Sequence, residues 1–175
     1  KRSQDYEEGR VKHVAIAVRA AMSEEGPEAI IAMKYLTQII GRQVNAGADF
    51  LDINMDEISI KPEEQQKAME WSVKTIQNKS SLPVSVDSSN IETIEVGLRS
   101  CADSSTETML NSASLERIEA LGLAKDYGSR VIVTAAGNEG MPQNNSERVD
   151  FGSRMVDAAL KEGIPLDYIY IDPLV

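Results

Sequence analysis

Two periodicities of hydrophobic and polar positions alternate along this chain. Apolar residues recur at intervals of three and four in Met33, Leu36 and Ile40, which marks one face of an amphipathic helix. Phe50–Met55 then alternates strictly between apolar and polar residues, which is typical of a half-buried strand. The same alternation of patterns continues to the end of the chain. It predicts helices over 27–44, 62–77, 91–98, 114–126 and 146–162, and strands over 50–55, 82–87, 108–111, 131–136 and 168–172.

Several predicted helices carry start or stop signals. Pro27 fits a first helical turn, and Ser89 lies three residues before Glu92, which is the spacing of a capping box. Ser114 is placed to cap the next helix, and Gly163 to end the last one.

Strands that alternate with helices imply right-handed βαβ crossovers and therefore a parallel sheet. The predicted strands recur about every 30 residues, close to the repeat of ~31 in a (β/α)8 barrel of ~250 residues. A doubly wound sheet has a similar repeat, so the spacing does not separate the two folds.

The parity of side chains along the strands favours the barrel. Polar groups share one face of each strand, while the opposite face is apolar. The shared-face residues are Asp52 and Asn54, Ser85 and Asp87, Met109 and Asn111, and Tyr170 and Asp172. Helices cover both faces of a doubly wound sheet, whereas a barrel points polar side chains inward near its carboxyl end. The alternative for any one of these acids or amides is that it caps the following helix.

Length, charge and cysteine content exclude several classes of protein. The 175 residues suffice for one domain, and the net charge of -10 would repel nucleic acid and anionic membranes. No apolar run approaches the ~18–20 residues of a membrane span. Cys101, the only cysteine, excludes an intramolecular disulfide, and a chain with one histidine and one cysteine makes a zinc site or other metal site unexpected. With no leader pattern at Lys1, we expect a cytoplasmic protein.

Four stretches at the strand ends resemble the pterin-binding barrels, and within them the methyltetrahydrofolate:corrinoid methyltransferases, which include the folate domain of cobalamin-dependent methionine synthase. They are Gly47-Ala-Asp-Phe-Leu-Asp-Ile-Asn, Val86-Asp-Ser-Ser-Asn, Met109-Leu-Asn-Ser-Ala-Ser and Tyr170-Ile-Asp-Pro-Leu. The stretches follow the family's order and cover nearly the whole chain. In the related dihydropteroate synthases, the first stretch normally reads Asp-Ile-Gly-Gly-Glu-Ser and the last Asp-Pro-Gly, and neither occurs here.

The resemblance implies a substrate, a partner and a set of site residues. Asp87, Asn111 and Asp172 would hold the pterin ring, and Asp52 and Asn54 would line the same pocket. Asn111 and Asp172 would also belong to the network that assists the departing nitrogen. The substrate would be 5-methyltetrahydrofolate, and the methyl acceptor a corrinoid (cobalamin) carried by a partner protein or domain.

Comparison with the family's motifs also indicates which strands of the barrel this sequence contains. The family's first strand, with its Gly-Glu-Arg-Ile-Asn motif, does not precede residue 50, and the last predicted strand corresponds to the family's sixth. We therefore expect an incomplete TIM barrel of about five of the eight strands, one partial domain over residues 1–175. Two partial barrels could join as a homodimer. The alternatives to a methyltransferase are a dihydropteroate synthase-like condensing enzyme and a non-catalytic pterin-binding fragment.

Overall fold

The computed structural model describes residues 12–23, 25–101, 107–138 and 140–175, which form five strands and six α-helices. The strands are β1 (Leu51–Asn54), β2 (Val84–Asp87), β3 (Thr108–Ala113), β4 (Arg130–Thr134) and β5 (Ile169–Asp172). The helices are α2 (His13–Met22), α3 (Gly26–Asn45), α4 (Pro62–Gln77), α5 (Ile91–Ser100), α6 (Ala120–Asp126) and α7 (Asn145–Glu162), with single 3-10 turns η1 (Asp56–Ile58) and η2 (Leu166–Tyr168).

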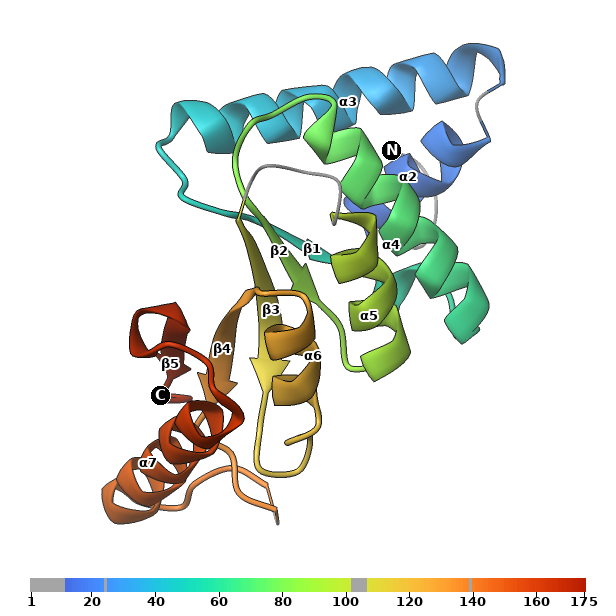
Figure 1. The fold of residues 1–175 in the computed structure, drawn as a ribbon. Coiled ribbons are helices and arrows are strands. Elements are labelled where there is room, and N and C mark those ends of the chain that lie inside the picture. The colour runs from blue at the N-terminus through green and yellow to red at the C-terminus, as the bar shows by residue number, and fades with distance from the viewer. Residues whose placement is uncertain (1–11, 24, 102–106, 139) are drawn as a thin grey trace.

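The five strands form one parallel sheet in the order β1-β2-β3-β4-β5. Each strand therefore pairs with its neighbours in sequence, and a helix follows each of β1 to β4 before the next strand (Figure 1). A doubly wound sheet reverses its strand order at a switch point, and no reversal occurs among these five strands. The predicted α/β fold is thus confirmed as a partial (β/α)8 barrel.

Along β1 and β4, the two faces of the sheet differ in burial as the parity of the sequence predicts. Along β1, Leu51 and Ile53 are buried while Asp52 and Asn54 are exposed. Along β4, Val131 and Val133 are completely buried, and Ile132 between them is not. The apolar face lies under the helices, which leaves the polar positions on the inner, concave side of the sheet.

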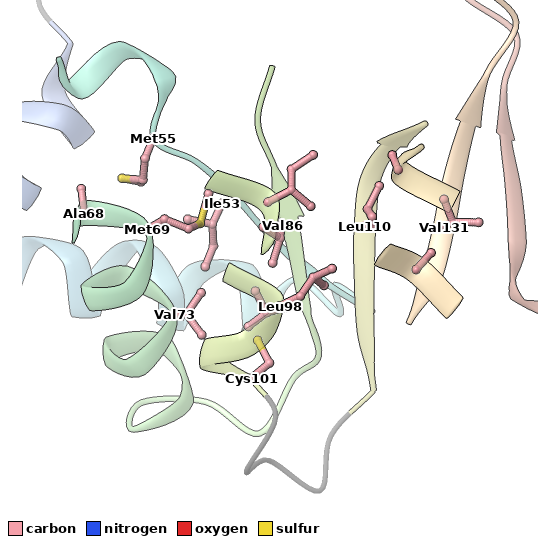
Figure 2. Close-up of a cluster of buried hydrophobic side chains, with 14 of the residues drawn as sticks. Ile53, Met55, Ala68, Met69, Val73, Val86, Leu98, Cys101, Leu110 and Val131 are labelled. Atoms are coloured by element: carbon pink, nitrogen blue, oxygen red, sulfur yellow. The ribbon is translucent and has the colours of Figure 1, made fainter. Parts of the chain in front are cut away.

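One part of the core lies where α4 and α5 cover β1 and β2. Met69 and Val73 of α4 and Leu98 of α5 pack against Val86 of β2 (Figure 2). Gly97 lets α5 approach the strand closely, since a Cβ atom there would lie 2.4 Å from Cγ1 of Val86. Burial of side chains of this size stabilises a fold by about 1.5–3 kcal/mol each.

Two of the predicted helix starts are wrong, and one predicted stop is confirmed. The N-cap of α5 is Asn90, whose side chain accepts a hydrogen bond from Thr93 N; Ser89 therefore does not cap this helix. Ser114 Oγ instead accepts from Arg117 N in a turn, and α6 begins only at Ala120. Gly163 ends α7 in the left-handed conformation, with φ of 95°.

Aromatic and charged side chains meet inside the curve of the sheet near the amino ends of the strands. The rings of Phe50, just before β1, and Tyr170 of β5 contact edge to face with centroids 6.5 Å apart. Arg130 donates two hydrogen bonds to Glu107, at 2.8 and 3.0 Å, and lies over the ring of Tyr168. The two outermost strands therefore approach one another across the interior.

Candidate functional site

Three of the predicted site residues form one row across the carboxyl ends of neighbouring strands. Asn54 of β1 is in register with Asp87 of β2, and Asp87 with Asn111 of β3. Adjacent strands lie about 4.8 Å apart, so three consecutive positions fall within reach of one small molecule. The structure thus brings together an amide, a carboxylate and a second amide, as the sequence predicts.

Hydrogen bonds join the residues of this row to one another and to Asp52 and Ser85, which lie two residues earlier on β1 and β2. Asn54 Nδ2 donates to Asp87 Oδ2 at 3.0 Å. Asp52 Oδ1 accepts from Ser85 Oγ at 2.6 Å and from Asn111 Nδ2 at 3.2 Å. Asp52 therefore orients Asn111 through its amide nitrogen.

Asp87 is the carboxylate at the centre of the row, and it is half-buried. Burial raises the pKa of Asp87, and the negative charges of Asp52 and Asp56 raise it further, against the opposing effects of the Asn54 hydrogen bond and the Arg117 charge. Among the described residues, Asn54 is the one hydrogen-bond donor to this carboxylate. A carboxylate can accept about four hydrogen bonds, so Asp87 retains acceptor capacity for a ligand.

Asp172 lies on the same face at the end of β5, in register with Thr134. Its Oδ1 accepts from Leu174 N at 2.9 Å. This is the local turn-capping contact that strand-end acids commonly make. The hydrogen bonds described for its side chain do not link it to the Asn54–Asp87–Asn111 row, from which β4 separates it.

A second set of residues, which the sequence analysis did not assign to the site, holds the row from behind. Asp56 accepts from Ser88 Oγ at 2.5 Å and from Ser89 N at 2.8 Å, which ties η1 to the end of β2. Burial opposes ionisation of Asp56, but these hydrogen bonds outweigh it, so the pKa of Asp56 lies below its ordinary value. Arg117 donates to Ser88 O at 2.9 Å and to Ser112 O at 3.1 Å.

Sequence signals for this second set differ in strength. Asp56 lies two residues beyond Asn54, so its place at the strand end follows from the pattern, but its partners do not. Arg117 lies in an irregular turn between β3 and α6, and nothing in its local sequence indicates contacts with the ends of two strands.

A cavity of about 750 Å³ borders the row beside Asn54. Its walls come from α2, α3 and the segment that follows β1, and they combine apolar and charged groups. The lining residues are Lys12, His13, Val14, Ala15, Tyr35, Asn54, Met55, Asp56, Glu57 and Ile58. Lys12 forms an ion pair with Glu57 at 3.0 Å, and Asp56 adds a second carboxylate to these walls.

Two features are absent from the part of the chain that the structure describes. No group of three or more histidine, cysteine, aspartate or glutamate side chains is arranged to hold a metal ion. None of the helices is both long and apolar enough to cross a membrane.

The arrangement suits a flat ligand with adjacent N–H groups and a carbonyl on one edge. A carboxylate accepts two parallel N–H bonds, and the neighbouring amides can donate and accept at the carbonyl edge. The sequence model of the family described as "Pterin binding enzyme" matches residues 28–175. The chain belongs to this family. The match includes every strand and every predicted site residue of the pterin-binding domain.

Solved structures similar to this pterin-binding chain include several dihydropteroate synthases. The Yersinia pestis enzyme matches with a TM-score of 0.64 and 19% identity, over 81% of this chain and 54% of that one. The Vibrio fischeri enzyme has a TM-score of 0.64 and 18% identity, over 81% of this chain and 56% of that one. For the Xanthomonas albilineans enzyme the TM-score is 0.64 with 20% identity, over 82% of this chain and 54% of that one.

These likenesses show the shared fold. The pterin-binding chain spans little more than half the length of the synthases it matches. All three are dihydropteroate synthases, the enzyme that the sequence analysis kept as its alternative, and none is a corrinoid methyltransferase.

Proposed function

We propose that this chain is the pterin-binding part of a methyltransferase that uses 5-methyltetrahydrofolate, with a corrinoid protein or domain as methyl acceptor. The observation that carries the pterin half of this proposal is the row of Asn54, Asp87 and Asn111 at the carboxyl ends of three adjacent strands. The methyl-transfer half depends on the sequence resemblance.

The donor and acceptor pattern of the row fits the edge of a reduced pterin. The pterin presents a 2-amino group beside a ring N–H, and Asp87 would accept from both. Asn111, which Asp52 orients through Nδ2, would bond the neighbouring ring positions. Asp172 would contact the ring from the opposite side of the partial barrel.

The residues that follow β1 favour a folate over a pterin pyrophosphate. Asp56 is held as a carboxylate by two hydrogen bonds, and Glu57 is paired with Lys12. A pyrophosphate needs N–H donors or cations, and these acids offer acceptors instead. Asp-Ile-Asn in β1 and Asp-Pro-Leu after β5 also depart from the corresponding synthase motifs.

In this reaction the chain would bind the folate, orient it and assist the departure of its nitrogen. The methyl group is attached to a tertiary nitrogen of the folate. This nitrogen is a poor leaving group unless it gains a proton or a hydrogen bond as its bond to the methyl group breaks. The corrinoid supplies the cobalt nucleophile that accepts the methyl group. Asn111 and Asp172 would assist through a hydrogen-bonded network, and assistance of this kind is worth about 10²–10⁴-fold.

A dihydropteroate synthase-like condensation is the second candidate. The solved structures favour it, because those named above are dihydropteroate synthases. It predicts that a pterin pyrophosphate binds at the same row and that p-aminobenzoate displaces the pyrophosphate.

Calorimetric titration separates the two candidates. We expect the chain to bind 5-methyltetrahydrofolate and to bind hydroxymethyl-dihydropterin pyrophosphate more weakly. Asp87→Asn should weaken folate binding, whereas Asp150→Asn, on an exposed helical position of α7, should leave it unchanged. Tight binding of the pyrophosphate with none of the folate would establish the condensing enzyme instead.

A further inference from the structure

Arg117 is the cation among the residues that support the Asn54–Asp87–Asn111 row from behind. Arg117 follows β3 by four residues, and its guanidinium lies between the carboxyl ends of β2 and β3. We infer that Arg117 is a positioning residue for pterin binding, which holds Asp87 and Asn111 at a fixed separation and balances the negative charge around them. This inference rests on the proposed function, because it assigns a role toward the same pterin site.

The geometric half of the inference comes from which backbone groups Arg117 binds. Ser88 directly follows Asp87, and Ser112 directly follows Asn111. Arg117 Nη1 donates to Ser88 O at 2.9 Å, and Nη2 donates to Ser112 O at 3.1 Å. One rigid fork therefore spans the two strand ends that carry the central pterin contacts.

Ser88 extends this support to β1. It is 1% exposed, its hydroxyl donates to Asp56 at 2.5 Å, and the same oxygen accepts from Asn90 N at 3.1 Å. Its backbone N–H donates to Asn111 O at 3.3 Å. Arg117 is thus connected through one buried serine to the ends of all three strands.

The electrostatic half comes from the charges that face Asp87. These are Asp52 on β1, Asp56 on η1 and Arg117 after β3. Burial and the two carboxylates raise the pKa of Asp87, while the Asn54 hydrogen bond and Arg117 lower it. A pterin that donates two hydrogen bonds requires the ionised carboxylate. Loss of the Arg117 cation raises the pKa of Asp87, so as the pH is lowered, binding should already be lost at a higher pH than in the unmodified chain.

Two substitutions separate the geometry from the charge. Arg117→Lys keeps the positive charge but replaces the planar fork with a single ammonium that cannot span both carbonyl oxygens in the same way. Arg117→Gln removes the charge. Arg154→Gln is the matched control, because Arg154 is an exposed residue of α7 whose ion-pair partner is Asp150, at 3.6 Å.

The experiment measures the dissociation constant for 5-methyltetrahydrofolate between pH 4 and 8 and, separately, the carboxyl carbon shift of Asp87 in the ligand-free chain. We expect Arg117→Gln to weaken binding about tenfold or more. It should also move the acid midpoint of binding upward by about half a pH unit or more. Arg117→Lys should weaken binding with a nearly unchanged midpoint, and Arg154→Gln should change neither quantity.

Binding by the unmodified chain distinguishes a failure of the proposed function from a failure of this inference alone. If the unmodified chain binds no reduced pterin, the proposed function fails, and the pterin role of Arg117 fails with it, whatever the Asp87 titration shows. If the chain binds folate but Arg117→Gln leaves the Asp87 titration unchanged, the charge role is overturned. Wild-type affinity in Arg117→Lys would overturn the geometric role, and an equal midpoint shift in Arg154→Gln would show only a general effect of charge.

Discussion

Strands β4 and β5 have similar apolar residues on their outer faces but very different surroundings. Val133 of β4 is 0% exposed, whereas Ile171 of β5, its partner in register, is 54% exposed. Both α6 and α7 pack on β4, whereas the main helical neighbour of β5 among the described residues is α7. An open groove of about 490 Å³ between α7 and β5 includes Ile171 and Val149 in its walls. Alternation in a sequence therefore indicates which face is apolar, and the neighbouring helices decide how much of it is buried.

The largest expected difference between β5 and the strands that helices cover fully, β3 and β4, is in the free energy of unfolding. Leu110→Ala in β3 should lower it by about 2–5 kcal/mol, because Leu110 is fully buried and its removal leaves a cavity. Ile171→Ala should cost less than about 1 kcal/mol, because more than half of that side chain is already exposed. Urea unfolding of the two variants measures the difference. Equal losses would mean that β5 is covered in solution.

The second expected effect concerns the ligand. Asp87→Asn should cost about 1.5–3 kcal/mol of binding free energy for a reduced pterin, because one acceptor becomes a donor that faces the N–H edge. Titration calorimetry with tetrahydrofolate measures it, and far-ultraviolet circular dichroism checks that the fold survives.

Asp172→Asn serves as the companion variant at β5. Asparagine keeps the oxygen that accepts from Leu174 N, so any loss of affinity reports on contact with the ligand and not on the turn. Unchanged affinity in this variant would reduce Asp172 to its capping role. Unchanged affinity in Asp87→Asn would exclude Asp87 from the pterin contact.

A smaller effect tests how closely helices approach the covered strands. Gly97→Ala should destabilise the chain by about 1–3 kcal/mol, because the new Cβ would collide with Val86. Gly41→Ala in α3 meets no atom within 4 Å and should stabilise the chain by about 0.5–1 kcal/mol through helix propensity. Thermal unfolding under identical conditions compares them, and a neutral Gly97→Ala would show that α5 can shift away from β2.

The smallest expected effect is weak self-association through the exposed edge and outer face of β5. Unpaired strand edges recruit other strands, although a net charge of -10 opposes contact between copies. Light scattering at increasing concentration should show association that Ile171→Lys reduces. Ile30→Lys makes the same change at an exposed position of α3 and should have no effect. A compact monomer at all concentrations would contradict this prediction.

The sequence predicts the order and type of the elements because strand alternation and helical spacing are local properties. It also places Asn54, Asp87 and Asn111 together, because parallel strands of matching parity bring their carboxyl ends to one edge. It does not predict the role of Arg117, since the contacts of a long side chain depend on how strand ends are arranged in space. The cap at Asn90 was missed because Ser89 matches the same motif one residue earlier.

The sequential strand order has a consequence for how the chain is made. Within the described residues, each of β2 to β5 pairs with the strand synthesised just before it, so each new βα unit can dock on a surface that has already emerged from the ribosome. A single α-helix separates β1 from β2, and one α-helix also separates each later pair of neighbouring strands. Domains are generally built from the N-terminus during translation, and here the sheet itself can grow in that direction, one strand at a time.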